Sequence, residues 1–241
     1  MLYSIKTDKG KQRENNQDAC FAAYPDKASC FAVICDGMGG ENAGEVASEM
    51  AVRIVSERVM AGWRPDITAE SVKNLFVSAI SAANICIFDE ARSDYEKSGM
   101  GTTVVAAAVV GDVCIIAHVG DSRAFLINAE LKKITRDHSY VQALIDNGLI
   151  TPSEAAVHPK KNYITRALGT NTRVDVDCTV LNLSPGDKIL LCSDGLTNYV
   201  SENDIQKTLK HENAEQAVCK LVDLANNSGG GDNISVAIIT T

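Results

Sequence analysis

The sequence predicts an α+β fold in which antiparallel β-sheets are flanked by helices. Short apolar runs bounded by turn residues predict buried strands, and two longer stretches repeat their apolar residues at helical spacing. Strands and helices follow one another in runs, without regular strand–helix–strand alternation. That order favours antiparallel sheets over a doubly wound parallel sheet.

The predicted strands each lie next to an acidic residue. The apolar runs are 31–35 before Asp36, 113–119 before Asp121, 189–192 before Asp194, and 234–239 after Asp232. Gly111-Asp112 interrupts the apolar stretch 102–119 and is typical of a hairpin turn, which argues against a membrane span there. Further strands are expected near Ile127 and Val180.

Four helices are expected besides these strands. Apolar residues recur at helical spacing over 46–59 and 72–87, which predicts two long amphipathic helices. Ser201 is a predicted N-cap for a third helix, and 214–225 forms the fourth. The apolar faces of the two long helices are expected to pack on the core rather than bind a partner, because surface helices of globular domains normally have this pattern.

The segment 137–169 interrupts the succession of strands. It lies between a strand ending near Ile134 and one expected near Val174, and it is predicted to hold two short helices. The second begins at Thr151-Pro152-Ser153-Glu154, where Thr is a suitable N-cap, Pro suits the first helical position and Glu can close a capping box. Two interpretations are open at this point: a flap beside a functional site, or an ordinary helical excursion.

Composition limits the classes of function. A length of 241 residues with 45% hydrophobic residues suits a single domain over 1–241 with a substantial core. The net charge of −8 argues against nucleic acid or an anionic membrane as partner, since both require basic patches. The eight cysteines form no Cys-x-x-Cys pair and mostly lie in apolar runs, as reduced core residues of a cytoplasmic protein do. The polar segment 1–18 has no signal-peptide stretch, so a soluble intracellular protein is expected.

The aspartates next to the strands have two interpretations. An Asp-Gly or Asp-Asn pair after a strand is usually only a turn. If the strands converge, however, Asp18, Asp36, Asp121, Asp194 and Asp232 repel one another, because each pair about 5 Å apart costs roughly 3 kcal/mol at an effective dielectric near 20. Bound cations would offset that repulsion, and oxygen-only ligands indicate Mg²⁺ or Mn²⁺ rather than zinc.

Other hydrolytic chemistries lack their motifs in this chain. The sequence has no G-x-S-x-G elbow, no H-E-x-x-H, no Walker loop and no complete G-x-G-x-x-G. The histidines are scattered along the chain, which suits structural or solvated roles better than metal ligation; they are His118, His138, His158 and His211. No cysteine has an Arg-rich phosphate loop or a paired His, so a cysteine nucleophile is not expected.

The hydrolytic chemistry that remains is the activation of water by metal ions that carboxylates hold. Asp36 can bridge two divalent ions, with the Gly37 carbonyl, Asp194 and Asp232 completing their coordination. A bridging water with a lowered pKa would then attack an anionic substrate such as a phosphoryl group in line. Arg13 is a candidate bidentate clamp for that group, although a solvated surface position is the commoner case for an arginine.

Six short motifs occur in a defined order along the chain: RENNQD at 13–18, DGMGG at 36–40, GTT at 101–103, VGDSR at 119–123, SDG at 193–195 and GDN at 231–233. Together they resemble the metal-dependent protein serine/threonine phosphatases of the protein phosphatase 2C, or PPM, family, and the compact length resembles its bacterial branch. The resemblance extends over essentially the whole chain.

The resemblance implies a four-layer αββα sandwich with two central antiparallel sheets, and a metal centre at one end that hydrolyses phosphoserine and phosphothreonine in proteins. By the same resemblance, Asp36 bridges two core Mn²⁺ or Mg²⁺ ions and Gly37 gives its carbonyl to one of them. Asp194 and Asp232 bind the other. The implied partners are phosphorylated proteins and a cognate Ser/Thr kinase, and the protein is expected to be a monomer.

The resemblance also implies roles around this core pair of ions. Asp18 holds metal-bound water, Arg13 binds the substrate phosphate, and Asp121 together with Asp194 binds a weaker third ion. Asn233 orients a water or its neighbouring aspartate. The family's flap corresponds to 137–169.

Two positions depart from the family pattern. Met38 stands where eukaryotic members have a His that is thought to protonate the leaving alkoxide, which Met cannot do. A metal-bound water near Asp121 would have to supply the proton, or the leaving step would be slower by roughly 10²–10⁴-fold. Gln17 replaces the usual Glu of the first motif, an exchange that is expected to be mild because that side chain acts through water.

Two alternatives to a broad phosphatase stay open. The first is a pseudophosphatase scaffold that binds phosphoproteins without turnover; such proteins usually lack a metal ligand, and none is missing here. The second is a phosphatase specialised for one regulator, which is expected to carry sensor domains for which this chain has no room.

Overall fold

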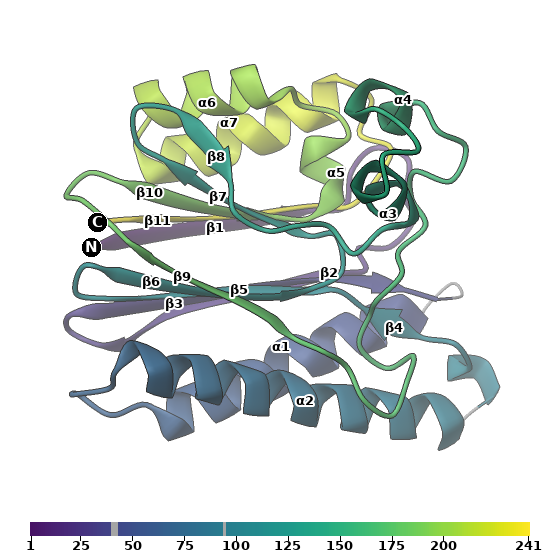
Figure 1. The fold of residues 1–241 in the computed structure, drawn as a ribbon, viewed down its shortest axis with the longest axis horizontal. Helices are drawn as coiled ribbons and strands as arrows, with labels where there is room; N and C mark the ends of the chain where they lie inside the picture. Colours follow the sequence, from purple (N-terminus) through teal and green to yellow (C-terminus); the bar gives the residue numbers. More distant parts are fainter. Residues whose placement is uncertain (40–42, 94) are drawn as a thin grey trace.

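The computed structural model describes residues 1–39, 43–93 and 95–241 and has the predicted α+β class. Two antiparallel sheets lie face to face, with α1 and α2 covering one outer face and α6 and α7 covering the other (Figure 1). The four-layer αββα sandwich implied by the family resemblance is therefore confirmed. The predicted site residues fall at one end of these sheets.

The first sheet has the strand order β1-β11-β10-β7-β8, and all neighbours are antiparallel. Its strands are β1 (Leu2–Asp8), β7 (Arg123–Ile127), β8 (Leu131–Lys133), β10 (Lys188–Cys192) and β11 (Ile234–Thr240). The short helix α5 (Asp194–Thr197) follows β10, and α6 (Glu202–His211) and α7 (Ala214–Asn227) cover the sheet. Phe125, Leu190 and Leu221 are fully buried in the core between them.

The second sheet has the order β2-β3-β5-β6-β9, and β4 pairs with the end of β3. Its strands are β2 (Asp18–Asp26), β3 (Ser29–Met38), β4 (Gly101–Thr102), β5 (Val104–Val110), β6 (Val113–Val119) and β9 (Asp177–Asn182). Its outer face carries α1 (Ala43–Gly62) and α2 (Ala69–Ser93), and the short 3₁₀ turn η1 (Tyr95–Lys97) follows them. The ring centroids of Phe31 and Phe76 lie 5.8 Å apart in this core.

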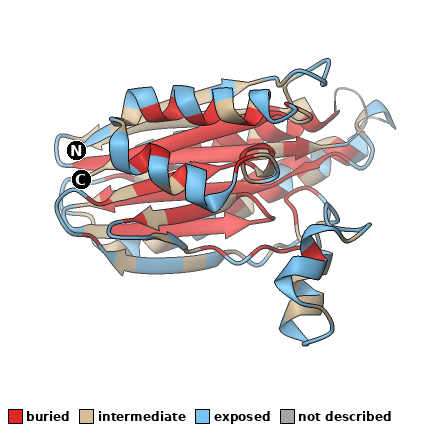
Figure 2. Cartoon of the chain, turned by 90° about the horizontal axis from the view of Figure 1, so that it is seen from above, coloured by how far each residue is buried: buried red, intermediate tan, exposed pale blue. Residues whose placement is uncertain are grey.

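The strands at the centre of the sandwich are apolar on both faces. In β3, Phe31 and Val33 face the helices, whereas Ala32 and Ile34 face the other sheet. Successive side chains of a strand point to opposite faces, so a strand between two apolar layers has no polar side. This is why the sequence shows continuous apolar runs instead of alternation, and Figure 2 shows the strands as mostly buried.

Most predicted elements are confirmed, and one boundary is wrong. The hairpin turn at Gly111-Asp112 joins β5 to β6, and Ser201 caps α6 by accepting a hydrogen bond from the backbone N–H of Asp204. The strand expected near Val174 begins only at Asp177. Val174 instead packs, partly buried, against the core under α1 and α2, which accounts for its apolar character.

Helix α2 has the length and apolar composition of a membrane-crossing helix, and among the described residues no other helix does. Its buried residues include Val72, Phe76, Ile80 and Ile87, and they pack against the second sheet. Packing on the sheet explains the apolar face that the sequence shows.

The segment 137–169 lies at one end of the sandwich and holds α3 (Tyr140–Asp146) and α4 (Pro152–Ala156), as predicted (Figure 1). The capping box is confirmed: Thr151 Oγ1 accepts from the N–H of Glu154, and Glu154 Oε2 accepts from the N–H of Thr151. Within these two helices only Ala155 is buried. Helices α3 and α4 are therefore much less buried than the helices that cover the sheets.

Candidate metal centre

The strand-end aspartates converge at one end of the two sheets. Asp18 at the start of β2 pairs in register with Asp36 on β3, and Asp194 begins α5 directly after β10. A cleft of about 280 Å³ opens here, and the predicted site residues that line it are Arg13, Asp36, Gly37, Asp121, Asp194, Asp232 and Asn233. Asp18 lies below the cleft and is 7% exposed. The structure thus brings together every predicted site residue.

Burial and the charges of neighbouring carboxylates raise the pKa values of the carboxyl groups in the cleft. Burial raises the pKa of Asp18 to about 7, and the charges of Asp194 and Asp232 add to the effect. Burial, followed by the charges of Asp18 and Asp194, raises the pKa of Asp36 well above its usual value. Burial and Asp194 raise the pKa of Asp121 to about 7. Buried like charges of this kind call for a cation among them.

Asp18 has one oxygen anchored and one free of protein partners. Its Oδ2 accepts a hydrogen bond of 2.7 Å from Ser193 Oγ, which in turn accepts from the N–H of Ser235. Ser193 stands at the N-cap of α5, yet its hydroxyl serves Asp18 and does not cap the helix. Asp18 Oδ1 is buried without a hydrogen-bond partner among the described residues. A buried carboxylate oxygen facing other carboxylates is suited to a divalent cation or its water, so the residues fit Mn²⁺ or Mg²⁺.

The backbone of Asp36 is held by two threonines. The N–H of Thr103 and the hydroxyl of Thr102 both donate to the carbonyl of Asp36, each at 2.9 Å. The N–H of Asp36 donates to Thr103 Oγ1, which also lies 2.7 Å from Ser122 Oγ. The motif at 101–103 had no predicted role. The structure shows that it fixes the strand end that carries Asp36.

Gly37 allows helix α1 to approach the cleft. A Cβ at this position would lie 2.0 Å from the carbonyl oxygen of Gly44, in the first turn of α1, and 2.7 Å from the carbonyl oxygen of Gln17. Only glycine fits between these two backbones. Of the predicted motif at 36–40, Gly40 lies outside the described residues.

Arg13 lies at the rim of the cleft, where it is paired with a predicted metal ligand. One of its guanidinium nitrogens is 2.9 Å from Asp232 Oδ1, and its Nε donates to the carbonyl of Gly231 at 3.3 Å. Its side chain is 53% exposed. The guanidinium is thus close to the carboxylates and accessible from solvent.

Asn233 holds the loop that carries Arg13. Its Oδ1 accepts from the N–H of Gln17, and its Nδ2 donates to the carbonyls of Lys9 and Asn15. Asn233 was expected to orient a water or the neighbouring aspartate, and its backbone N–H, not its side chain, donates to Asp232 Oδ1. The side chain binds backbone groups that are distant in sequence, so no local pattern could predict these contacts.

The two departures from the family pattern both border the cleft. Met38 lines it beside Asp36, so the position holds a thioether without a transferable proton. Gln17 lines it too, and its side chain reaches the start of α1, where a Cβ on Gly44 would lie 2.9 Å from Gln17 Oε1.

Two of the histidines that are far apart in the sequence lie side by side in the structure. The rings of His118 and His138 stack with centroids 4.7 Å apart and an interplanar angle of 15°. Together with Asp177 they place potential ligand atoms within 4.8 Å of one another. Sequence reasoning missed this group because β6, β9 and the start of the 137–169 segment meet only in the folded chain.

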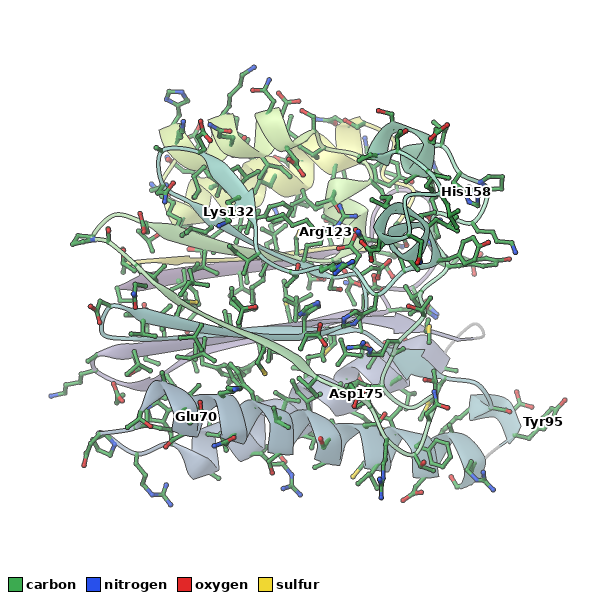
Figure 3. The ribbon with its side chains drawn as sticks, viewed as in Figure 1. Glu70, Tyr95, Arg123, Lys132, His158 and Asp175 are labelled. Atoms are coloured by element: carbon green, nitrogen blue, oxygen red, sulfur yellow. The ribbon has the colours of Figure 1, made fainter. Side chains whose placement is uncertain are left out.

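A buried ion cluster joins β7 and β8 to the start of the 137–169 segment. Asp137 accepts hydrogen bonds from Arg123 Nε and from the guanidinium NH2 group, the latter at 2.7 Å, and Lys133 Nζ lies 2.6 Å from its Oδ1. Burial raises the pKa of Asp137, but the charge and hydrogen bonds of Arg123 outweigh it and leave the pKa lowered. Arg123 lies at the sheet end next to α3 and α4 (Figure 3).

The model of the protein phosphatase 2C family matches residues 7–226. The chain belongs to the protein phosphatase 2C family. The predicted motifs that carry the cleft residues fall inside that range, apart from the last one at 231–233.

Several relatives of this family member match nearly the whole chain. A serine/threonine phosphatase, stp, of Listeria monocytogenes is 38% identical, covering 99% of this chain and 95% of its own. The serine/threonine phosphatase Stp1 from Staphylococcus aureus has a solved structure with a TM-score of 0.93 and 37% identity, covering 99% of this chain and 94% of its own. The catalytic domain of the serine/threonine protein phosphatase PstP, crystallised with two manganese ions, has a TM-score of 0.86 and 33% identity, covering 98% of this chain and 96% of its own.

Proposed function

We propose that this protein is a metal-dependent phosphatase that hydrolyses phosphoserine and phosphothreonine in proteins. The observation that carries the proposal is the group of buried carboxylates that raise one another's pKa in a cleft with Arg13 at its rim. The family membership supports it, as do the relatives named as serine/threonine phosphatases and the two manganese ions bound to the PstP catalytic domain.

The cofactors proposed are two core Mn²⁺ or Mg²⁺ ions and a weaker third one. Asp36, the Gly37 carbonyl, Asp194 and Asp232 would hold the core pair, and Asp121 with Asp194 would hold the third. When bound, the ions lower the pKa of water and offset the charge of the phosphoryl oxygens. Oxygen donors alone are the ligands that these hard cations prefer.

The chain's own residues bind and orient the reactants. Arg13 presents a planar guanidinium to the phosphoryl oxygens, which suits a bidentate contact. Asp18 is fixed through Oδ2, so its Oδ1 can accept a proton from water and orient that water's lone pair towards phosphorus. The water oxygen then forms a bond to phosphorus, the P–O bond to the Ser or Thr oxygen breaks, and that oxygen takes a proton from water beside Asp121, because Met38 has none to give.

We also propose that the segment 137–169 is a flap over one side of this cleft, within a single domain. Asn162 and Ile164 line the cleft from this segment.

The proposal also includes a cognate Ser/Thr kinase as partner, a monomeric state and a cytoplasmic location. All eight cysteines are free, which suits a reducing compartment, although Cys86 and Cys219 are exposed and so differ from the core positions expected for most of them.

The test is phosphate release from a phosphothreonine peptide by the purified protein. We expect turnover with added Mn²⁺, none after chelation, and loss of at least about 10³-fold in Asp194→Ala. Asp223→Ala, on the exposed face of α7, is the matched control and keeps full activity. Turnover that survives chelation or persists in Asp194→Ala would contradict the proposal, and metal-dependent peptide binding without turnover would favour the pseudophosphatase alternative.

A further inference from the structure

His138 holds Gly120 from two sides. The N–H of His138 donates to the carbonyl of Gly120 at 2.9 Å, and the N–H of Gly120 donates to His138 Nδ1 at 3.0 Å. Gly120 directly precedes Asp121, and His138 is the second residue of the 137–169 segment. The root of the predicted flap is therefore hydrogen-bonded to the turn that carries the weaker metal ligand.

The same turn is packed against the residue that holds Asp36. Gly120 has a φ of +104°, and a Cβ there would lie 2.6 Å from Thr103 Cγ2. Thr103 accepts from the N–H of Asp36 and contacts Ser122 through its hydroxyl. Gly120 is closely packed between Thr103 and His138. Removal of either side chain is therefore expected to shift the backbone that leads into Asp121.

The contacts of His138 define which of its nitrogens carries the proton. A nitrogen that accepts from a backbone N–H has no proton of its own, so the neutral ring is protonated on Nε2. Nε2 lies 3.3 Å from Asp177 Oδ2 but makes no hydrogen bond among the described residues, and Arg166 holds the other oxygen of that carboxylate at 2.6 Å. Burial, followed by the charge of His118, lowers the pKa of His138, which favours the neutral ring.

The ring is also fixed in orientation. It stacks on His118, whose Nε2 lies 2.9 Å from the carbonyl oxygen of Arg136 and donates to it. The carbonyl of His138 accepts from the N–H of Thr165, which ties the outgoing and returning chains of the predicted flap together.

These contacts argue against a metal site at His118, His138 and Asp177. A histidine that ligates a metal through Nε2 normally donates its Nδ1 proton to an acceptor. His118 could bind a metal through its other nitrogen, because its Nε2 donates to a carbonyl and its Nδ1 remains for a ligand. His138 has the reverse pattern, since Nδ1 faces an N–H donor and Nε2 must keep its proton.

We propose that His138 is a positioning residue: as the Nε2-protonated tautomer, it holds Gly120 and thereby places Asp121 for the weaker metal ion, coupling the root of the flap to that ligand. The inference rests on the proposed function, because it takes Asp121 as the ligand of the third ion. It adds a residue that touches neither metal nor substrate.

The test is a calorimetric titration of Mn²⁺ into the purified protein and its variants, with Asp121→Asn marking the weak class of ion. His138→Leu removes the acceptor for Gly120 and weakens the weak class by at least about 10-fold, the size expected for a residue that orients a ligand. His138→Asn restores an acceptor at the position of Nδ1, so its affinity stays within about 3-fold of wild type. The tight class is unchanged in both variants.

The matched control is His158→Leu. His158 lies farther out in the predicted flap, and its Nδ1 also accepts from a backbone N–H, that of Lys160 at 3.0 Å (Figure 3). The control removes the same kind of hydrogen bond without a link to Asp121, so Mn²⁺ binding stays as in wild type. Thermal unfolding of each metal-free variant checks that it is folded.

A second measurement on the wild-type protein does not depend on the folding of a variant. Nitrogen-15 spectra of the histidine rings, with His138 assigned by its loss in His138→Asn, show an unprotonated Nδ1 and a protonated Nε2. The opposite tautomer overturns the proposal, and so does an ion bound at the two stacked histidines, or equal weak-class affinity in His138→Leu and wild type. Phosphatase activity of the wild type with the tight ions alone tests the proposed function separately.

Discussion

Single residues in the cleft are strained electrostatically rather than sterically. Asp36 has the carboxylates of Asp18 and Asp194 around it and no cationic side chain among the groups that shift its pKa most. Arg13 pairs with Asp232 at the rim. The protein therefore keeps a destabilising group of like charges, which a cation-dependent reaction explains and a turn does not.

The substitution Asp36→Asn separates stability from activity. It removes one charge from the cluster and keeps the size of the side chain, so the metal-free protein gains roughly 2 kcal/mol in free energy of unfolding. Phosphopeptide turnover with Mn²⁺ falls by about 10³-fold, because the residue proposed to bridge both core ions is lost. Denaturant unfolding in chelator and a turnover assay measure the two effects, and a variant that loses both stability and activity would falsify the charge-cluster interpretation.

Asn233 has a different role, since its side chain supports backbone. Asn233→Ala leaves the N–H of Gln17 and the carbonyls of Lys9 and Asn15 without their partner. We expect a loss of about 2–3 kcal/mol in stability and a raised KM for phosphopeptide, because the loop that carries Arg13 is released. Glu14→Ala, at an exposed position of the same loop, serves as comparison. Unchanged KM in Asn233→Ala would show that the loop keeps Arg13 in place without this side chain.

Among the helices and strands, the sequence predicts best those whose position depends on a local apolar pattern. The runs in β3, β6, β10 and β11 are apolar on both faces, so their positions and their terminal aspartates were predictable. Contacts between distant elements left no such signal. The contacts of Asn233 with the N-terminal loop and of His138 with Gly120 depend on which strands become neighbours in the fold. The family resemblance supplied the roles of the aspartates, which spacing alone left open between turns and ligands.

The junction of β7, β8 and the predicted flap depends on Asp137. Asp137→Ala leaves Arg123 and Lys133 partly buried without their carboxylate, and we expect a loss of about 3 kcal/mol in stability at neutral pH. The lowered pKa of the folded state means that this stabilisation is complete above the unfolded pKa near 3.9 and is lost as the pH falls through the folded value.

Urea unfolding of Asp137→Ala at pH 7 measures this contribution. The control is Lys132→Ala, an exposed residue of β8 next to Lys133 (Figure 3), for which we expect a change within about 0.5 kcal/mol. Equal stability of Asp137→Ala and wild type would mean that the attraction between Asp137 and its two cationic partners only offsets the free-energy cost of burying these charges.

The whole molecule combines a well-packed sandwich with an end where buried carboxylates repel one another. Three apolar cores lie between the four layers, and the carboxylates gather where the strands of both sheets end. Because the cores hold the strand ends in place, the cleft cannot relax by moving its aspartates apart. The repulsion is instead expressed in the pKa values of the carboxylates and in the global stability.

The stability of the metal-free protein should therefore fall as the pH rises from 6.5 to 8. Asp18 and Asp121 have folded pKa values of about 7, and that of Asp36 is also raised, whereas unfolded Asp has a pKa of about 3.9. Between these values the folded state binds more protons than the unfolded state, so unfolding becomes easier with rising pH. His118 and His138 have lowered pKa values and act in the opposite direction, but only below their unfolded pKa of about 6.5.

Bound Mn²⁺ should remove most of this dependence, because the cations compensate the carboxylate charges. The increase in unfolding temperature caused by Mn²⁺ is then larger at pH 8 than at pH 6.5, also because fewer protons compete for the ligands at the higher pH. Scanning calorimetry at both pH values, with and without chelator, measures it, and Asp36→Asn should show a flatter profile without metal than wild type does. A metal-free wild type that becomes more stable from pH 6.5 to 8 would mean that the carboxylates ionise without repelling one another, and the cation requirement of the cleft would lose its physical basis.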